Sequence, residues 1–428
     1  MKSYILKILL FISLLISVLA LNIIYEKYQV YINSEISNIT PLSWKKYYYK
    51  YKSQNNNFPH LKLIIPDAGY DELKKNRLTA LHNENGKSLL TKSIRNYVDS
   101  KVVFNGKVID SKIRLKGLMK GHWEDPIKWS FKVKLKEDKI FGLKKFGLMT
   151  PVQRGCINEW VFHKLNDHLN NLSLKYEFIE LSLNDMYLGN YVIEEAFDTK
   201  NHNSNNKIIL KFDLNNYYEK LRNDSLPSCI EEYNYLHIPK CFYEQLKIIS
   251  YGKSNECDFI YAKNLLSKFR DGKLKTHEVF DIEKLAGYIS VTTLMGNQHP
   301  FYLHNVRIMY NKKSKLLEII PYDLERYHLI SEEESYEKFL PWKRSYFRNT
   351  FLDQIMSDKI FREKYFETLS KLVESQTIDD FLKDNLNQID YIKRNLKSDC
   401  VDLEIDLLSA IKINRDYIKR LLYNKSIL

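Results

Sequence analysis

The hydrophobic pattern changes along this chain, from a period of two in its first half to a spacing of three and four near its end. Apolar and polar residues alternate from Tyr97 to Gly117, and an Asn-Gly pair within this stretch is typical of a hairpin turn. The stretch Lys128–Lys136 alternates again, with lysines opposite apolar residues. From Tyr346 to Leu428, leucines and isoleucines recur at helical spacing. The chain is therefore predicted to be α+β, with an antiparallel β-rich N-terminal part and a helical C-terminal part.

Further elements follow from the same two patterns. We predict a short strand at residues 61–66, helices at 70–81 and 156–172, and a hairpin at 176–197. A third helix at 281–296 leads into a closing hairpin at 305–325. The first of these hairpins turns at Asn184-Asp185, and the closing hairpin turns in the polar stretch NKKSK. Residues 214–280 carry a weaker pattern, which we interpret as an insertion or a helical elaboration.

The N-terminus predicts a membrane or secretion signal. Lys2 and Lys7 precede an uncharged apolar run from Ile8 to Ile24, close to the shortest length that spans a bilayer. This run is either a signal anchor of a single-pass cell-membrane protein, with the rest of the chain outside, or a signal peptide of a secreted protein, cleaved near Ala20. We divide the chain into this N-terminal segment (1–24), a polar stalk (25–58), a folded domain (59–345) and a helical C-terminal region (346–428).

The charge and the cysteines restrict the partners. The 428 residues carry a formal net charge of +13, which favours anionic partners such as phosphates, acidic glycans or lipid headgroups. No nucleic-acid-binding module is recognisable, and no nucleic-acid partner is expected. The 5 cysteines include no Cys-x-x-Cys pair, which argues against a zinc site. Cys229 and Cys241 could form a disulfide in an oxidising compartment.

The closing hairpin carries candidate metal ligands at both ends. Asn305 begins its first arm and Asp323 ends its second, and their oxygens are the hard ligands that Mg²⁺ prefers. Glu325 lies two residues further on, and His299, just before the hairpin, could act as a base. From the residues alone, these side chains are either a metal site or the polar ends of an ordinary hairpin.

A basic loop follows the strand that ends near Leu115. Its glycines, Gly117 and Gly121, could allow backbone N–H groups to approach phosphates, with Arg114 or Lys116 beside them. The loop lacks the GxxxxGK[ST] pattern of a P-loop. It is either a phosphate-binding loop or an ordinary basic turn.

Lysines on the strand Lys128–Lys136 are the next candidates. Lys132 and Lys134 either bind phosphates or form a solvated strand face. A kinase-like site needs such a lysine paired with a carboxylate. Glu194 and Glu195 end an apolar strand and are the candidate partners, although neighbouring strand residues face opposite ways and only one can point at a given site.

In their order along the chain, these segments resemble the spore-coat protein H (CotH-like) family of atypical, kinase-like proteins. The matching segments are IRLKG, KWSFKVKL, FGLKKFGLMTP, NEWVFHKL, YEFIELSLNDMYLGNYVIEEAF and HNVRIMY followed by IIPYDLE. Each is loose alone, but their order from about Leu61 to Tyr327 is fairly specific. The resemblance implies a divergent protein-kinase-like fold that binds ATP and Mg²⁺ or Mn²⁺ and phosphorylates protein hydroxyls.

The resemblance also implies roles for the nucleotide-binding residues. Lys132 or Lys134 would hold phosphates, Glu194 or Glu195 would be the paired acid, and Arg114 would lie in the loop over the nucleotide.

At the other end of the implied site, Asn305 and Asp323 would hold the metal, with Asp323 also in the catalytic centre. Glu325 stands where the family has an aspartate. The family often has an acid before the strand that carries the asparagine, and here the stretch is Gly296-Asn-Gln-His-Pro, so His299 is the candidate base.

We therefore expect a membrane-anchored or secreted kinase that phosphorylates hydroxyls of a surface or envelope protein or polysaccharide. The alternatives are a non-catalytic envelope or coat scaffold and a module that binds acidic glycans. The missing acid near His299, and a location where ATP is scarce, favour the scaffold. The retained Asn305, Asp323 and Glu195 favour the enzyme.

Overall fold

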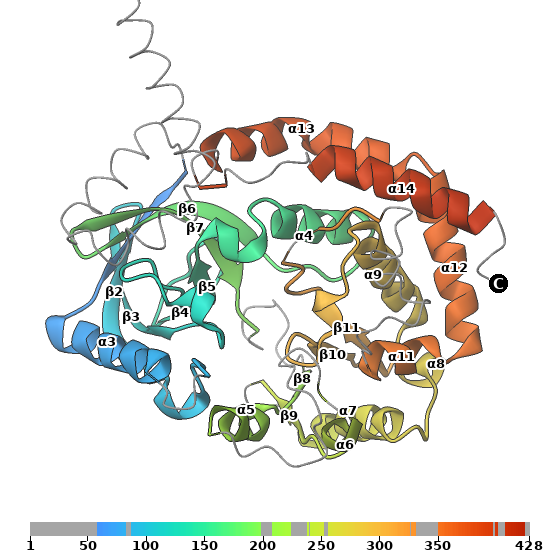
Figure 1. Cartoon of the computed structure of the whole chain (residues 1–428), viewed down its shortest axis with the longest axis horizontal. Coiled ribbons are helices and arrows are strands. Elements are labelled where there is room, and N and C mark those ends of the chain that lie inside the picture. Colours follow the sequence, from blue (N-terminus) through green and yellow to red (C-terminus); the bar gives the residue numbers. More distant parts are fainter. Residues whose placement is uncertain are drawn as a thin grey trace, which may run out of the picture.

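The described part of the chain is α+β, with strands first and helices last (Figure 1). This computed structural model describes residues 58–82, 87–197, 208–223, 238, 240–251, 256–325, 327–330, 350–396, 399–400 and 407–423. The predicted anchor, nearly all of the predicted stalk, and Cys229 lie outside these ranges. Within them, none of the helices combines the length and the apolar character needed to cross a membrane.

The N-terminal strands close into a barrel, in the order β1-β2-β3-β4-β5-β7-β6. Their bounds are β1 (His60–Ile64), β2 (Val98–Phe104), β3 (Lys107–Leu115), β4 (Phe131–Leu135), β5 (Lys145–Met149), β6 (Tyr176–Leu183) and β7 (Met186–Glu195). Neighbouring strands are antiparallel, except that β1 and β6 run parallel. Alternate residues of β4, Phe131, Val133 and Leu135, lie in the barrel core, as the sequence pattern predicts. Helix α3 (Asp67–Leu81) packs against β2 and β3.

A second, four-stranded antiparallel sheet has the order β11-β10-β8-β9. Its strands are β8 (Ile208–Phe212), β9 (Ile248–Ser250), β10 (Ile308–Asn311) and β11 (Leu316–Ile319). Residues 214–280, predicted as an insertion or helical elaboration, supply β9 as well as the helices α5 (Asn215–Arg222), α6 (Lys240–Tyr243), α7 (Glu256–Arg270) and α8 (Thr276–Val279). The central helix α9 (Ile282–Leu294) follows them.

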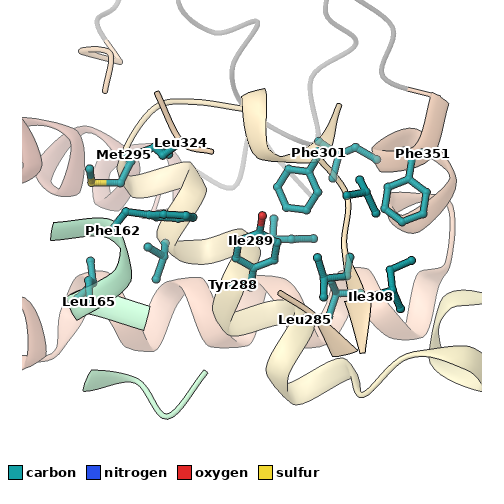
Figure 2. Packing of buried hydrophobic residues seen from close by; sticks show 14 of the residues in the cluster. Phe162, Leu165, Leu285, Tyr288, Ile289, Met295, Phe301, Ile308, Leu324 and Phe351 are labelled. Atoms are coloured by element: carbon teal, nitrogen blue, oxygen red, sulfur yellow. The ribbon is translucent and has the colours of Figure 1, made fainter. Parts of the chain in front are cut away.

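A large hydrophobic core surrounds α9, in which every residue from Leu285 to Leu294 is buried. Figure 2 shows Tyr288 and Ile289 of this helix among Phe162 of α4 (Asn158–His168), Ile308 of β10 and Phe351 of α11 (Thr350–Met356). The other C-terminal helices contribute to the same core: α12 (Lys359–Glu374), α13 (Thr377–Leu396) and α14 (Leu407–Tyr423). The C-terminal helices and the central helix therefore share one core.

The elements predicted from the sequence are confirmed as β1, α3, α4, the β6–β7 hairpin, α9 and the β10–β11 hairpin. The last hairpin is shorter than predicted, because Asn305 and Asp323 lie in the segments before β10 and after β11 and not at the ends of the strands. The predicted Asn-Gly turn joins β2 to β3, where Asn105 and Gly106 have φ of 49 and 76°. Short 3₁₀ helices lie at Lys92–Ile94, Lys120–His122, Pro151–Arg154 and His299–Phe301. A disulfide that the sequence did not predict joins Cys156, before α4, to Cys400, after α13.

Candidate functional site

A cleft of about 550 Å³ lies between the barrel and the second sheet. It brings together residues that are far apart in the sequence. The predicted site residues that line it are Arg114, Lys132, Glu194, Glu195, His299, Asn305, Asp323 and Glu325. Lys134 is the exception: it is exposed on β4 and is not part of the cleft wall.

A buried ion pair stands in the barrel wall of the cleft. The Nζ of Lys116, just after β3, lies 2.9 Å from Oε2 of Glu194 in β7. To reach it, the lysine crosses β5 at Gly147, which is in register with Glu194. A Cβ on Gly147 would lie 2.7 Å from Cε of Lys116, so a larger residue here would displace the lysine from this path. The lysine that pairs with Glu194 is thus Lys116, whereas the sequence favoured Lys132 or Lys134 as the partner of this acid.

Burial and neighbouring charges shift the pKa values of both members of this pair. Burial lowers the pKa of Lys116, and the adjacent Glu194 only partly opposes this shift. Burial by itself would raise the pKa of Glu194, but Lys116 and Arg154 outweigh it and hold that pKa below its usual value. Glu194 is therefore ionised at neutral pH.

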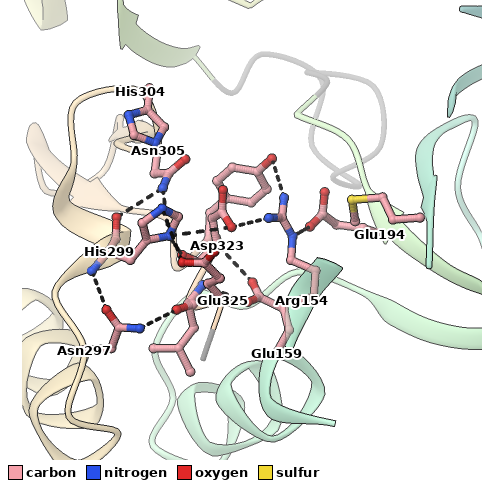
Figure 3. A network of polar contacts seen from close by, with 12 residues as sticks. Arg154, Glu159, Glu194, Asn297, His299, His304, Asn305, Asp323 and Glu325 are labelled. Carbon is pink, nitrogen blue, oxygen red and sulfur yellow. Dashed lines mark hydrogen bonds and ion pairs between the residues drawn. The ribbon is translucent and has the colours of Figure 1, made fainter. Parts of the chain in front are cut away.

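Arg154 connects Glu194 to Asp323 (Figure 3). Its Nε lies 3.1 Å from Oε1 of Glu194, and its Nη1 contacts Oδ1 of Asp323. Its Nη2 donates to the hydroxyl of Tyr322 at 3.2 Å. Burial would raise the pKa of Asp323, but Arg154 and His299 hold it well below its usual range. One guanidinium thus compensates two buried carboxylates.

Hydrogen bonds to the side chain of Glu159 position the backbone around Asp323. Asp323 and Glu325 have φ of 62 and 68°, a left-handed conformation that is uncommon for residues other than glycine. The carboxylate of Glu159, which is 0% exposed in the first turn of α4, accepts from the N–H groups of Asp323 and Leu324 at 2.8 and 2.7 Å. A Cβ on Gly155 would overlap the carbonyl oxygen of Glu325. Glu159 and Gly155 therefore fix the direction in which Asp323 points.

His299 lies between the two acids of this segment. Its Nδ1 is 2.8 Å from the carbonyl oxygen of Asp323, so Nδ1–H donates to that carbonyl, and in the neutral ring Nε2 is the acceptor. Nδ1 is also 3.8 Å from Oδ1 of Asp323, and Nε2 is 3.8 Å from Oε2 of Glu325. Asn305 donates from Nδ2 to the carbonyl oxygen of His299 at 3.1 Å. The amide oxygen of Asn305 accepts no hydrogen bond from the described residues.

Lys132 and Glu195 also border the cleft. Glu195 accepts the backbone N–H of Lys175 at 3.1 Å, whereas Glu194 faces the cations, as alternation along β7 requires. Burial, together with the positive charge of Arg114, lowers the pKa of Lys132 to about 7. Lys132 has no carboxylate partner among the described residues.

The donors at this end of the cleft fit a divalent metal only in part. No three or more His, Cys, Asp or Glu side chains of the described residues are grouped to hold a metal by themselves. Mg²⁺, however, is commonly held by one or two protein oxygens together with waters and phosphates. The ionised Asp323 and the amide oxygen of Asn305 fit that smaller set. The ring of His299 lies between Asp323 and Glu325, which sets Glu325 apart from the other two.

The geometry agrees with what a family comparison finds. The family model described as CotH kinase protein matches residues 113–400, well over half of the chain. This chain belongs to the CotH kinase family. The match includes every predicted site residue, and the resemblance drawn from the order of the motifs is confirmed. No curated protein gives a significant match to this CotH chain.

The sequence did not single out Arg154 and Glu159, and it considered Lys116 only as part of a basic loop. Arg154 lies in a 3₁₀ turn, where no periodicity marks it. Glu159 did carry a signal, because it is an acid directly before the apolar run Trp160–Phe162 of the predicted helix, and the structure buries residues 158 to 163. A buried acid in such a place needs hydrogen-bond donors, and here the segment after β11 supplies them.

Proposed function

We propose that this CotH chain is a metal- and ATP-dependent kinase with a divergent protein-kinase-like fold. The observation that carries the proposal is the buried Lys116–Glu194 pair, which shares one cleft with Asp323 and Asn305. Kinase sites combine a lysine–glutamate pair for the phosphates with an aspartate and an asparagine for the metal. The family match to CotH kinase protein supports the same reading.

The barrel wall offers the phosphate-binding residues. Arg114 and Lys132 are in register across β3 and β4, so both side chains can reach one polyphosphate. Lys116 stands beside them, oriented by Glu194. Because the pKa of Lys132 is lowered by burial and by surrounding cations, a bound phosphate would supply the negative partner that Lys132 lacks among the described residues.

The opposite end of the cleft offers the residues for transfer. Asp323 and Asn305 would hold Mg²⁺ or Mn²⁺, which when bound neutralises charge on the phosphates. Glu159 keeps the backbone of Asp323 in place. His299, whose Nδ1–H is bonded to a carbonyl, presents Nε2 to accept the proton of the acceptor hydroxyl.

We place the acceptor among hydroxyls of a surface or envelope protein or polymer. The predicted apolar run at the N-terminus supports a protein that is anchored in the cell membrane or secreted. The disulfide between Cys156 and Cys400 supports a location outside the reducing cytosol, because such bonds persist in oxidising compartments.

The test is nucleotide binding by the purified full chain in detergent. We expect Mg·ATP or Mn·ATP to bind, Asp323→Ala to abolish binding, and phosphate transfer to a protein acceptor to require the same residue. Lys134→Gln is the control, since Lys134 lies outside the cleft. Absence of binding with both metals, in a protein shown to be folded by circular dichroism, would overturn the proposal.

A non-catalytic coat or envelope scaffold is the second candidate, and Arg154 favours it. Its guanidinium already compensates Asp323, the residue that the kinase needs for metal. A scaffold of this kind would show no phosphate transfer, and removing divalent metal would not alter its stability.

A further inference from the structure

Cations and aromatic rings alternate along the cleft, starting at the contact with Asp323. The guanidinium of Arg154 lies 5.3 Å from the centre of the Tyr322 ring. That of Arg307 lies 5.6 Å from the same ring and 5.7 Å from the ring of Tyr251. The Nζ of Lys211 then lies 5.2 Å from Tyr251. All five side chains line the cleft, and we call them the cation ladder.

The outer cations of the ladder lack acidic partners. Neither Arg307 nor Lys211 forms an ion pair with a carboxylate of the described residues. Arg307 donates from Nη1 to the carbonyl oxygens of His304 and Val306, and its buried Nε has no hydrogen-bond partner. The ladder therefore holds positive charge and a buried donor that the described residues leave uncompensated.

A third cation reinforces the outer end. Arg95 lines the same cleft, and among the described residues its Nε donates to the carbonyl oxygen of Thr91. Burial and the neighbouring Arg307 lower the pKa of Lys211 to about 8, although Asp213 opposes the shift. Gathering partly buried cations costs free energy in the free protein, and a bound anion removes that cost.

The cations of the ladder adjoin those assigned to the nucleotide, since Arg307 is among the charges that lower the pKa of Lys132, but they lie on a different wall of the cleft. In the proposed kinase, the phosphates are held at the barrel wall by Lys116, Arg114 and Lys132, whereas Arg307 and Lys211 belong to the second sheet and the segment before it. The ladder begins at Asp323, where the acceptor hydroxyl would react, and leads away from it.

We propose that the cation ladder binds the acceptor, an acidic peptide whose hydroxyl reaches Asp323 and whose carboxylate or phosphate groups lie on Arg307 and Lys211. This inference rests on the proposed kinase function. A peptide is favoured over a sugar polymer because Tyr251 and Tyr322 each already contact two cations, and Phe197 packs against both. Little ring face is left for a sugar to stack on.

The test compares serine peptides with glutamate, glutamine or lysine flanks. Binding to the purified full chain is followed by fluorescence anisotropy without nucleotide, and phosphorylation is followed with Mg·ATP. We expect the glutamate peptide to bind about tenfold or more tightly than the glutamine peptide, and to weaken as salt rises. The lysine peptide should bind least.

A pair of variants with the same charge change locates the effect. Lys211→Gln removes a cation whose described contacts are with the ring of Tyr251, so the fold should be unaffected. We expect this variant to weaken the binding of the glutamate peptide about tenfold and to leave the binding of the glutamine peptide unchanged. The affinity for ATP should change less than about twofold. Lys134→Gln, on the exposed face of β4, should alter none of the three.

The inference is wrong if the glutamate and glutamine peptides bind equally, or if the two variants weaken the glutamate peptide to the same extent. Tighter binding of an acidic polysaccharide than of any acidic peptide would also overturn it. Failure of the kinase proposal is separate: ATP binding would be absent while the glutamate peptide still bound through Lys211.

Discussion

Gly147 determines whether Lys116 can reach Glu194. A methyl group at this position would lie 2.7 Å from Cε and 2.9 Å from Cδ of Lys116, the far part of a flexible side chain that can move aside. Moving the lysine aside removes one of the two cation partners of the buried Glu194, so Gly147→Ala should lower the free energy of unfolding by about 1–3 kcal/mol. It should weaken ATP binding about tenfold, because the displaced ammonium no longer meets Glu194. Urea unfolding and a nucleotide titration measure the two effects.

Two further variants calibrate this result. Lys116→Met should lose a similar amount of ATP affinity, since it removes the same charge. Gly69→Ala, in α3, adds a methyl group away from the cleft and should not affect ATP binding. Wild-type ATP affinity in Gly147→Ala would show that the Lys116–Glu194 pair is not part of the nucleotide site.

Single residues show where sequence reasoning succeeds and where it ends. Glu194 and Asp323 could be predicted, because each is a polar residue at the end of an apolar strand or hairpin. Alternation along a strand also predicts that Glu194 and Glu195 face opposite ways, but it does not choose between them. It cannot say which of several lysines meets the acid, because that depends on Lys116 crossing β5 at a glycine. Contacts of this kind arise between strands that only the barrel brings together.

Helix α4 matters to the site through one buried side chain, Glu159. Its carboxylate accepts from consecutive N–H groups, and a glutamine would present an N–H group of its own to one of them. Glu159→Gln should lower the free energy of unfolding by about 1–3 kcal/mol, the usual cost of an unsatisfied buried group. It should also weaken Mg·ATP binding, since the backbone of Asp323 is no longer held. Asp167→Asn, on the exposed end of the same helix, should do neither. Equal stability of the two variants in urea would argue against this role for Glu159.

At the scale of elements, periodicity identifies strands and helices but not their closure. The hairpins β2–β3, β6–β7 and β10–β11 could be predicted, because their turns and alternation are local. The parallel pairing of β1 with β6, which closes the barrel, joins segments with the β2–β5 strands between them. Strand β9 was missed, because Ile248–Ser250 is too short for its pattern to stand out from its surroundings. Non-local pairing and short length both remove the signal on which such predictions depend.

At the scale of the whole molecule, the end of α13 is attached to the barrel. The Nζ of Lys128 lies 3.5 Å from Oδ1 of Asp399. The Nδ2 of Asn190, in β7, donates to Oδ2 of Asp399 at 2.7 Å and to the carbonyl oxygen of Asn395 at 3.0 Å. The disulfide from Cys400 then reaches the turn that carries Arg154. The C-terminal helices thus support the same turn that compensates Asp323.

Breaking that disulfide should therefore affect both stability and the site. Cys400→Ser should lower the free energy of unfolding by about 2–4 kcal/mol, since the bond closes a long loop of chain. It should also weaken Mg·ATP binding, because Cys156 is two residues from Arg154. Urea unfolding with and without reductant measures the first effect: reductant should destabilise the wild type and leave the variant unchanged. Cys257→Ser, at an exposed free cysteine, is the control and should match the wild type. A reductant effect that persists in full in Cys400→Ser would mean that another bond stabilises the protein.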